Sequence, residues 1–330
     1  MGSGDFPLWL FCHIRICRAG FTLHRGKGLI LEQTIRSAVA CRGVGLHSGA
    51  PVALRLLPAA VGTGIIFRRT DLDGFEVEAI SRNVARVSYA TSLMKKGVLI
   101  STTEHLLSAF VGMGLDNAVV ELDNLELPIL DGSGLPFVDL IRRAGIRQQR
   151  RARRYLRILR AIELREGNKF IALYPSDRYS VSYSINFSHP LIGEEVHELE
   201  LTNGQYVSGI APARTFGFMH EAEAMRQQGL IRGASSENVL ILTREGLINP
   251  PLRFADEFVR HKILDLIGDL ALVGRQILGR VVADRAGHAM HTALVSRLLR
   301  DQSLWEETTV EEETKQSSVS SALPARPMLA

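Results

Sequence analysis

The sequence predicts an α+β fold with two similar domains, in each of which a β-sheet is layered with helices. At 330 residues the chain is long enough for two modest domains with separate cores. A strand-rich stretch followed by helical periodicity occurs twice, and a dense run of arginines separates the two occurrences. We therefore expect domain I over residues 31–148, a basic linker over 149–155 and domain II over 156–303.

Short apolar or alternating segments bounded by glycine and proline predict the strands of domain I. These strands cover residues 34–39, 52–57, 64–68 and 118–122. Apolar residues at helical spacing predict helices over 103–110 and 137–144. A turn rich in glycine, with Gly43, Gly45 and Gly49 followed by Pro51, separates the first two strands.

Domain II repeats the same order of strands and then helices. Strands are predicted over 156–159, 170–174, 179–185 and 239–242. A short helix is expected over 222–228, and a long one over 257–273. Two such layers would face each other, so an active site between them would collect residues from both halves.

The two ends of the chain differ from the rest in composition. Residues 1–30 form an N-terminal extension with a single acid, Asp5, and several basic residues, as in a weak organellar presequence or an extended start. Residues 304–330 form an acidic tail with little periodic hydrophobicity, which we expect to be disordered or loosely docked. No apolar run is long enough for a membrane span. A cytoplasmic protein is expected, or an imported one if residues 1–30 are a presequence.

Cysteine and charge narrow the functional classes. The three cysteines, Cys12, Cys17 and Cys41, lie near the N-terminus and none lies beside the His/Asp pairs discussed below, which argues against a disulfide framework and a thiolate metal site. The net charge is +4, with a basic segment that could hold phosphates or nucleic acid. Few aromatic residues interleave with it, so a solvated linker is the favoured interpretation. The basic residues are Arg142, Arg143, Arg147, Arg150, Arg151, Arg153, Arg154, Arg157 and Arg160.

A stripe of chemically active side chains lies on the long helix expected in domain II. His261, Asp265 and Asp269 are spaced four apart and so share one helix face, where an imidazole and a carboxylate can converge on a cation. His105, at the start of an apolar helix, is the best candidate for a third ligand. Two histidines and one carboxylate, with a position left for water, form the ligand set of a catalytic zinc. Glu104 would be the adjacent general base.

Each of these features also has an ordinary structural interpretation. His261 and Asp265 could form a simple intrahelical hydrogen-bonded pair, which is the commoner outcome for such a pair taken alone. Ser101 and Glu104 match a capping box, in which the glutamate reaches back to the cap amide. The remaining motifs of the chain favour the catalytic interpretation.

Six motifs in register closely resemble the zinc-dependent UDP-3-O-acyl-N-acetylglucosamine deacetylases of lipid A synthesis. The resemblance runs from about residue 32 to about residue 299. It implies a β-α-α-β sandwich with small inserts and an enzyme that releases acetate from a UDP-linked, 3-O-acylated N-acetylglucosamine. The motifs are GVGLHSG (43–49), TEHLL (103–107), LDGS (130–133), ARTFGF (213–218), FVRHKILDLIGD (258–269) and GHA (287–289).

The resemblance assigns roles to the residues of the site. It implies that His105, His261 and Asp265 bind zinc and that Glu104 is the general base. It makes His288 the general acid that protonates the leaving amine.

Three further side chains would support these steps. The resemblance implies that Thr215 hydrogen-bonds the oxyanion and that Lys262 adds positive charge. Asp269, one turn after Asp265, is expected to hold His288 in its charged form, because a nearby carboxylate favours imidazolium.

Substrate contacts also follow from the resemblance. Lys169, Phe187 and Phe216 match positions that contact the phosphate, the uracil and the substrate, and Arg285 replaces the usual lysine at a phosphate position. Residues 218–242 correspond to an insert that forms an apolar passage for the acyl chain. Its candidate lining residues could equally be core of the insert. These are Met219, Ala224, Met225 and Leu230, and His47 is expected to line the site without binding metal.

The main rival hypothesis is a basic α+β module that binds RNA or another polyanion without catalysis. The histidines and acids lie on apolar helices whereas the arginines lie in a connector, which favours the enzyme. We expect no nucleic-acid partner, a monomer, and peripheral membrane contact only through the lipid-tailed substrate. Zinc is the expected cofactor, although iron or cobalt suits the same ligands.

Overall fold

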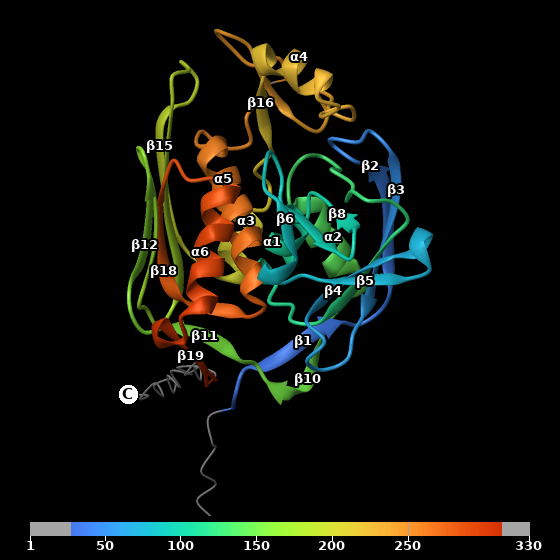
Figure 1. Cartoon of the computed structure of the whole chain (residues 1–330), viewed down its shortest axis with the longest axis vertical. Helices are drawn as coiled ribbons and strands as arrows, with labels where there is room; N and C mark the ends of the chain where they lie inside the picture. The colour runs from blue at the N-terminus through green and yellow to red at the C-terminus, as the bar shows by residue number, and fades with distance from the viewer. Residues whose placement is uncertain (1–27, 250, 312–330) are drawn as a thin grey trace, which may run out of the picture. The chain divides into compact units, whose positions relative to one another are not determined.

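The computed structural model describes residues 28–249 and 251–311, of which Leu29–Glu311 form one compact unit. Two β-sheets lie on the outside of this unit and helices fill the space between them (Figure 1). The α+β class and the β-α-α-β layering predicted from the sequence are therefore confirmed. Within the described residues no helix is long and apolar enough to cross a bilayer.

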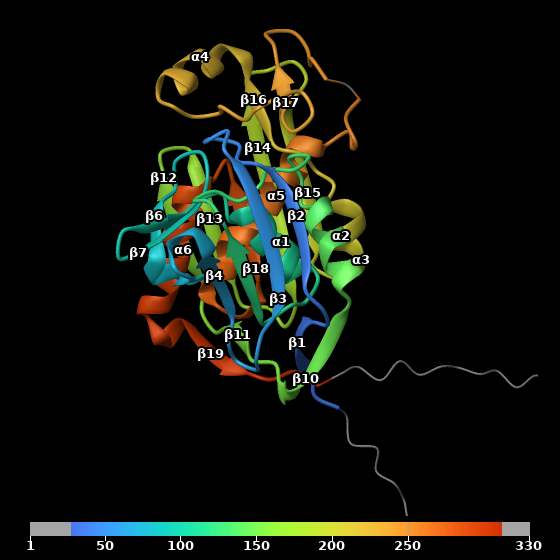
Figure 2. The ribbon, with the colours of Figure 1, turned by 90° about the vertical axis from the view of Figure 1, so that its right-hand side faces the viewer.

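The sheet of the first half follows the order β2-β3-β9-β4-β5. Every second residue of β3 is buried, including Val52, Leu54 and Leu56, as expected for a strand with one face on the core. Helix α1 lies behind this sheet in Figure 2. The elements of this half are β2 (Val39–Val44), β3 (Pro51–Pro58), β4 (Ile65–Arg69), β5 (Phe75–Glu78), β6 (Val84–Arg86), β7 (Ser92–Lys95), β8 (Val98–Ile100), α1 (Glu104–Gly112), β9 (Ala118–Leu122) and α2 (Leu135–Ala144).

The sheet of the second half has seven strands, with β18 pairing three neighbours. Strand β14 also alternates, with Tyr179, Val181, Tyr183 and Ile185 buried. The elements are β11 (Tyr155–Ile158), β12 (Ile162–Glu166), β13 (Lys169–Tyr174), β14 (Tyr179–Phe187), β15 (Gly193–Glu200), α3 (Asn203–Gly209), α5 (Glu257–Leu270), β18 (Gln276–Asp284), α6 (His288–Arg300) and β19 (Trp305–Thr308). The predicted long helix ends at Leu270 and continues as a 3-10 turn, because Gly274 caps it in the left-handed conformation.

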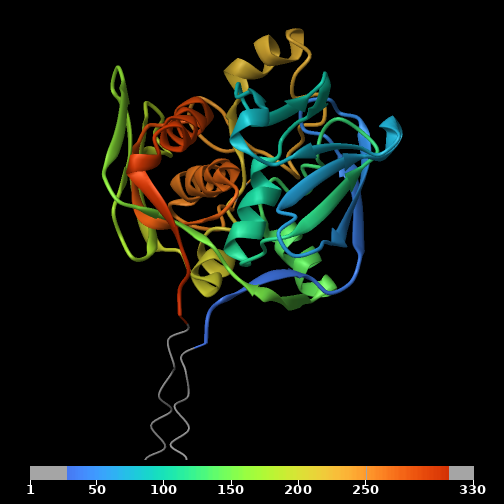
Figure 3. The ribbon, with the colours of Figure 1, turned by 60° about the horizontal axis from the view of Figure 1, so that its bottom comes forward.

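Helices α1 and α5 meet in the middle of the unit, where the two halves join (Figure 3). A Cβ atom added to Gly268 of α5 would lie 2.0 Å from the backbone oxygen of Glu104. Only glycine allows two backbones to approach this closely. The contact fixes the start of α1 against the face of α5 that carries the predicted metal stripe.

A small insert extends from the second half at the top of Figure 1. It consists of β16 (Phe216–Phe218), α4 (Met219–Gln227) and β17 (Leu240–Leu242), with the two strands parallel. The helix and strand expected over 222–228 and 239–242 are therefore present, each within a few residues of its predicted bounds.

The expectation of a single strand over 34–39 is wrong. The chain turns at 36–38, where the amides of Arg36 and Ser37 donate to the carbonyls of Gly145 and Ala144. Strand β1 (Leu31–Ile35) precedes this turn and pairs with β10 (Ile146–Ala152), and β2 follows it.

The basic segment is also more ordered than a solvated linker. Residues 149–152 belong to β10, and β11 begins at Tyr155. Three of its arginines are held by acids that are distant in sequence. Arg151 pairs with Glu32, Arg153 with Asp116 at 2.9 Å, and Arg154 with Glu307 at 2.8 Å.

The expectation of a disordered tail is wrong for its first residues. Strand β19 pairs antiparallel with β11, and the amide of Ile30 donates to the carbonyl of Val310 at 2.9 Å. Residues 1–27 and 312–330 of the predicted extension and tail lie outside the described residues.

Candidate active site

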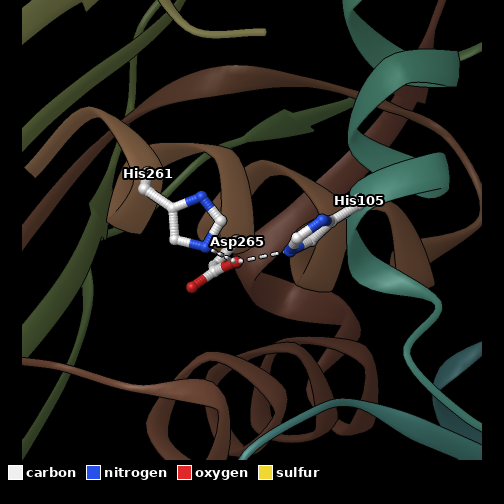
Figure 4. A group of neighbouring side chains, drawn as sticks. All are labelled: His105, His261 and Asp265. Carbon is white, nitrogen blue, oxygen red and sulfur yellow. Dashed lines mark ion pairs between the residues drawn. The ribbon is translucent and has the colours of Figure 1, made fainter. Parts of the chain in front are cut away.

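Three buried side chains from the two central helices converge at one point (Figure 4). His105 comes from the first turn of α1, and His261 and Asp265 lie one turn apart on α5. The Nε2 atoms of His105 and His261 lie 3.6 and 3.3 Å from Oδ1 of Asp265. The ligating atoms of all three residues lie within 4.8 Å of one another. The structure thus brings together the three predicted ligands.

The protonation and hydrogen bonds of this cluster fit a divalent cation. The Nδ1 atom of His261 lies 3.1 Å from the carbonyl of Ala213, which fixes the tautomer and leaves the Nε2 lone pair toward Asp265. Burial lowers the pKa of His261 to about 3, so this imidazole is neutral. Burial opposes ionisation of Asp265, but the charge of Lys262 and a hydrogen bond from His105 hold its pKa well below the usual range. The Nε2 atom of His105 faces Asp265, whereas its buried Nδ1 has no hydrogen-bond partner among the described residues.

Glu104 has the position and acidity of a general base. Its side chain is 3% exposed, and one carboxylate oxygen accepts a hydrogen bond from the amide of Thr91 at 3.1 Å. Burial raises the pKa of Glu104 to about 7, against the opposing effect of His288 and His105. A carboxylate that exchanges its proton near neutral pH is suited to accept one from water.

His288, which is partly buried, and Asp269, which is fully buried, form a second pair beside the first cluster. The Nδ1 atom of His288 lies 2.7 Å from Oδ2 of Asp269, and its Nε2 atom lies 4.0 Å from Oδ2 of Asp265. Burial alone would lower the pKa of His288, but the charge and hydrogen bond of Asp269 raise it to about 9. The imidazolium is therefore the stable form at neutral pH, as a general acid requires.

Two residues around Asp269 were not among the predicted site residues. His291 Nδ1 donates to the same oxygen, Oδ2, at 2.8 Å, and the hydroxyl of Thr91 donates to Oδ1 at 2.5 Å. A His-x-x-His spacing on a helix was a usable signal for His291, because residues three apart lie on one face. Thr91 lies in a loop, and nothing in its sequence context distinguishes it.

Lys262 and Thr215 lie at the same site. The ammonium of Lys262 donates to Asp265 at 3.1 Å and sits 5.3 Å from the ring centroid of Phe216. The backbone amide of Thr215 donates a hydrogen bond to the carbonyl of Gly132 at 2.9 Å, which fixes the position of this residue. Both residues line the cavity described next.

A cavity of about 250 Å³ joins this polar centre to an apolar arm under the insert. The polar end is formed by the three predicted ligands with Glu104 and His288, and His47 lines the same cavity, as expected. Of the predicted passage residues, Met219 and Met225 line the cavity whereas Ala224 and Leu230 do not. The apolar arm is completed by Leu46, Ala222, Ile231, Val239 and Ile241.

The predicted substrate contacts separate into two groups. The rings of Phe187 and Phe216 meet edge to face with centroids 5.8 Å apart, and Phe216 lines the cavity. Lys169 and Arg285 lie outside the cavity, at the adjoining ends of β13 and β18, where Phe170 pairs with Asp284. Arg285 has a left-handed φ of 52° and its guanidinium donates to Asp284 at 2.9 Å.

Comparison with known proteins gives one consistent result. Residues 32–300 match the model of a family described as UDP-3-O-acyl N-acetylglycosamine deacetylase. A protein of Solibacter usitatus named UDP-3-O-acyl-N-acetylglucosamine deacetylase is 56% identical over 282 residues, covering 85% of this chain and 95% of the relative. Proteins with the same name from Xylella fastidiosa (strain Temecula1 / ATCC 700964) and Cellvibrio japonicus are 44% and 42% identical, covering 83% and 86% of this chain and 92% and 95% of their own length.

Proposed function

Because the chain belongs to the UDP-3-O-acyl-N-acetylglucosamine deacetylase family, we propose that it removes acetate from the N-acetyl group of UDP-3-O-(3-hydroxyacyl)-N-acetylglucosamine, the committed step of lipid A biosynthesis. One observation supports this most strongly. A buried cluster of two histidines and a carboxylate shares a cavity with a base near neutrality, a charged imidazole and an apolar arm. This combination suits hydrolysis of an amide on an acylated sugar.

His105, His261 and Asp265 would hold the metal, which we propose to be zinc. Neutral imidazole and carboxylate are ligands that Zn²⁺ accepts, and three protein ligands leave a position open. When bound, zinc supplies a Lewis acid for the acetamide carbonyl and for water. Lys262, which donates to Asp265, adds positive charge beside these ligands.

The remaining steps are proton transfers by the chain. Glu104 takes a proton from water as the water oxygen bonds to the acetyl carbon. Thr215 and Lys262 stabilise the negative charge that develops on the carbonyl oxygen. His288 gives its Nε2 proton to the glucosamine nitrogen as the C–N bond breaks, because Nδ1 is engaged by Asp269. Acetate and a free amine result.

Recognition of the substrate would use the rest of the cavity and its surroundings. The acyl chain lies in the apolar arm, against Met219 and Met225. Phe216 and Phe187 contact the sugar nucleotide, and Lys169 and Arg285 bind its phosphates outside the cavity. In this proposal residues 31–148 and 156–303 are two domains that each contribute part of the site. We further propose a cytoplasmic monomer that touches the membrane only through its substrate.

Three arginines of the basic run favour this function over the polyanion-binding alternative. Arg151, Arg153 and Arg154 are paired with Glu32, Asp116 and Glu307, so their charge is neutralised within the fold. A nucleic-acid surface requires cations that are free to contact phosphates.

The test is acetate release from the acylated UDP-sugar by the purified protein, before and after chelation and zinc addition. We expect activity that chelation abolishes, that zinc restores, and that Glu104→Ala removes while the variant still binds metal. Glu121→Ala is the matched control, because this carboxylate lies in β9, on the sheet and away from the cavity. A folded, zinc-loaded protein that releases no acetate would contradict the proposal.

A further inference from the structure

A further buried carboxylate, Glu126, lies between the apolar arm and the start of helix α1. Its side chain is 1% exposed. The backbone around it is fixed, because Ser101 donates to the carbonyl of Leu125 at 2.8 Å and Leu127 donates to the carbonyl of Ser101 at 3.1 Å. A carboxylate buried this deeply must be hydrogen-bonded to be tolerated. Three groups donate hydrogen bonds to the Glu126 carboxylate, and they show which segments of the chain it holds in place.

Two of the donors belong to the glycine-rich loop over 43–49. The amides of His47 and Ser48 donate to Oε1 and Oε2 of Glu126 at 2.8 and 2.7 Å. A Cβ atom on Gly45 would lie 2.4 Å from Oε2, so the loop approaches the carboxylate only because residue 45 is glycine. The conformation of this loop is therefore built around Glu126.

The same loop is joined to the insert. The amides of Arg232 and Gly233 donate to the carbonyls of His47 and Leu46 at 3.1 and 3.0 Å. A Cβ atom on Gly233 would lie 2.2 Å from the oxygen of Gly45, so these backbones are also in direct contact. Leu46, His47 and the neighbouring Ile231 line the cavity. The loop and the insert together form one wall of the apolar arm.

The third donor leads to the catalytic helix. The hydroxyl of Thr102 donates to Oε1 of Glu126 at 3.0 Å. Thr102 has φ of 59°, a left-handed conformation that is unfavourable for a β-branched residue and persists only where its surroundings impose it. It lies two residues before Glu104 and three before His105. One carboxylate thus holds both the wall of the acyl arm and the entry to the helix that carries the base and a ligand.

We propose that Glu126 is a positioning residue that makes deacetylation depend on the acyl chain. This inference rests on the proposed function. An acyl chain packed in the arm stabilises the wall formed by the loop and the insert. Through Glu126 and Thr102 the ordered wall fixes the start of α1, and with it the carboxylate of Glu104. A substrate without the chain leaves the wall unsupported and gains nothing from this connection.

The test compares Glu126→Gln with the wild type on two substrates, the 3-O-acylated UDP-sugar and UDP-N-acetylglucosamine. The amide of glutamine cannot accept at both positions, so at least one loop amide loses its partner. We expect kcat/KM for the acylated substrate to fall roughly tenfold or more, which corresponds to one lost charge-assisted hydrogen bond. The kcat/KM for UDP-N-acetylglucosamine should fall much less, so the ratio of kcat/KM for the acylated substrate to that for the unacylated one should decrease.

A purely structural role would give a different result. Equal losses on both substrates, or no loss on either, at unchanged zinc content would overturn the proposal. If Glu126→Gln does not fold, Thr102→Val replaces it under the same criterion, because it removes one donor and keeps the shape. Glu121→Gln is the control that should leave both values unchanged.

Failure of the proposed function is recognised separately. If the zinc-loaded wild type releases no acetate, hydrogen exchange still tests the connection. Glu126→Gln should then speed exchange at the amides of His47 and Ser48 and also at Arg232 and Gly233. Faster exchange confined to the first pair would overturn the connection between the loop and the insert.

Discussion

His288 and Asp269 are joined by a hydrogen bond of 2.7 Å between Nδ1 of the imidazole and Oδ2 of the carboxylate. The side chain of Asp269 is fully buried and that of His288 is only slightly exposed. The bond determines both the charge of the imidazole and the direction of its other nitrogen. Asp269 is itself fixed by Thr91 and His291, so the orientation of His288 is set by more than one partner. An acid held this way can deliver its proton in one direction only.

The first prediction concerns this pair. Asp269→Asn should lower kcat by roughly 100-fold or more, because the neutral amide no longer favours the imidazolium or its orientation. KM should change little, since neither residue is proposed to bind the substrate's nucleotide or acyl chain. Steady-state kinetics measure the two values, with Asp139→Asn on the exposed face of α2 as the control. An unchanged kcat would show that Asp269 does not act through His288.

The second prediction is a bell-shaped pH dependence of kcat/KM. Glu104 must be deprotonated to act, so activity rises as the pH passes its pKa of about 7. His288 must be protonated, so activity falls as the pH passes its pKa of about 9. A bound cation favours the carboxylate and moves the acidic limb to lower pH. The residual activity of His288→Gln should lack the alkaline limb, and a limb that persists would assign it to another group.

The third prediction concerns metal and stability. The three proposed ligands come from both halves of the unit, so a metal bound by them would stabilise the folded state but not the unfolded one. At free zinc about 1,000 times Kd the gain is about 4 kcal/mol. Thermal unfolding with and without chelator measures it as a change in Tm. Asp265→Ala should lose this dependence on zinc, whereas Asp139→Ala should keep it.

The fourth prediction concerns the contact between α1 and α5. Gly268→Ala places a Cβ atom against the backbone of Glu104, which must move. We expect a loss of about 1–3 kcal/mol in the free energy of unfolding, together with lower activity. Urea denaturation measures the free energy of unfolding, and acetate release measures the activity. Gly204→Ala in α3 is the control, because its Cβ would meet nothing within 4 Å, and its stability should not decrease.

The predicted metal cluster illustrates what local spacing can reveal. His261 and Asp265 lie four apart on an apolar helix, and the histidine after Glu104 opens another, so the sequence alone grouped the residues that the structure brings together. Thr91 could not be found this way, because it reaches Asp269 only through the fold. Glu126 is similar, since its donors lie 24 or more residues away in the chain.

The misjudged segments have the same cause. The arginines over 149–155 are interpreted as part of a solvated linker because few aromatic residues interleave with them. Arg151 and Arg153 instead pair with Glu32 and Asp116, which are distant in sequence. Helix α6 is not among the elements expected from the sequence, although Met290, Leu294 and Leu298 follow helical spacing and are buried.

Because Ile30 pairs with Val310, the two ends of the compact unit lie side by side. The contacts of the fold therefore do not require the first half to precede the second half in the chain. A linker across these positions and a new opening at the exposed turn of Lys96 and Gly97 would give a circular permutant with every contact of the centre retained. Helix α1 would then leave the ribosome near the start of the chain, whereas β2, β3, β4 and β5 would follow the whole of the second half. Four strands of the first sheet would arrive late in translation and not early, and the same cluster of side chains would still close.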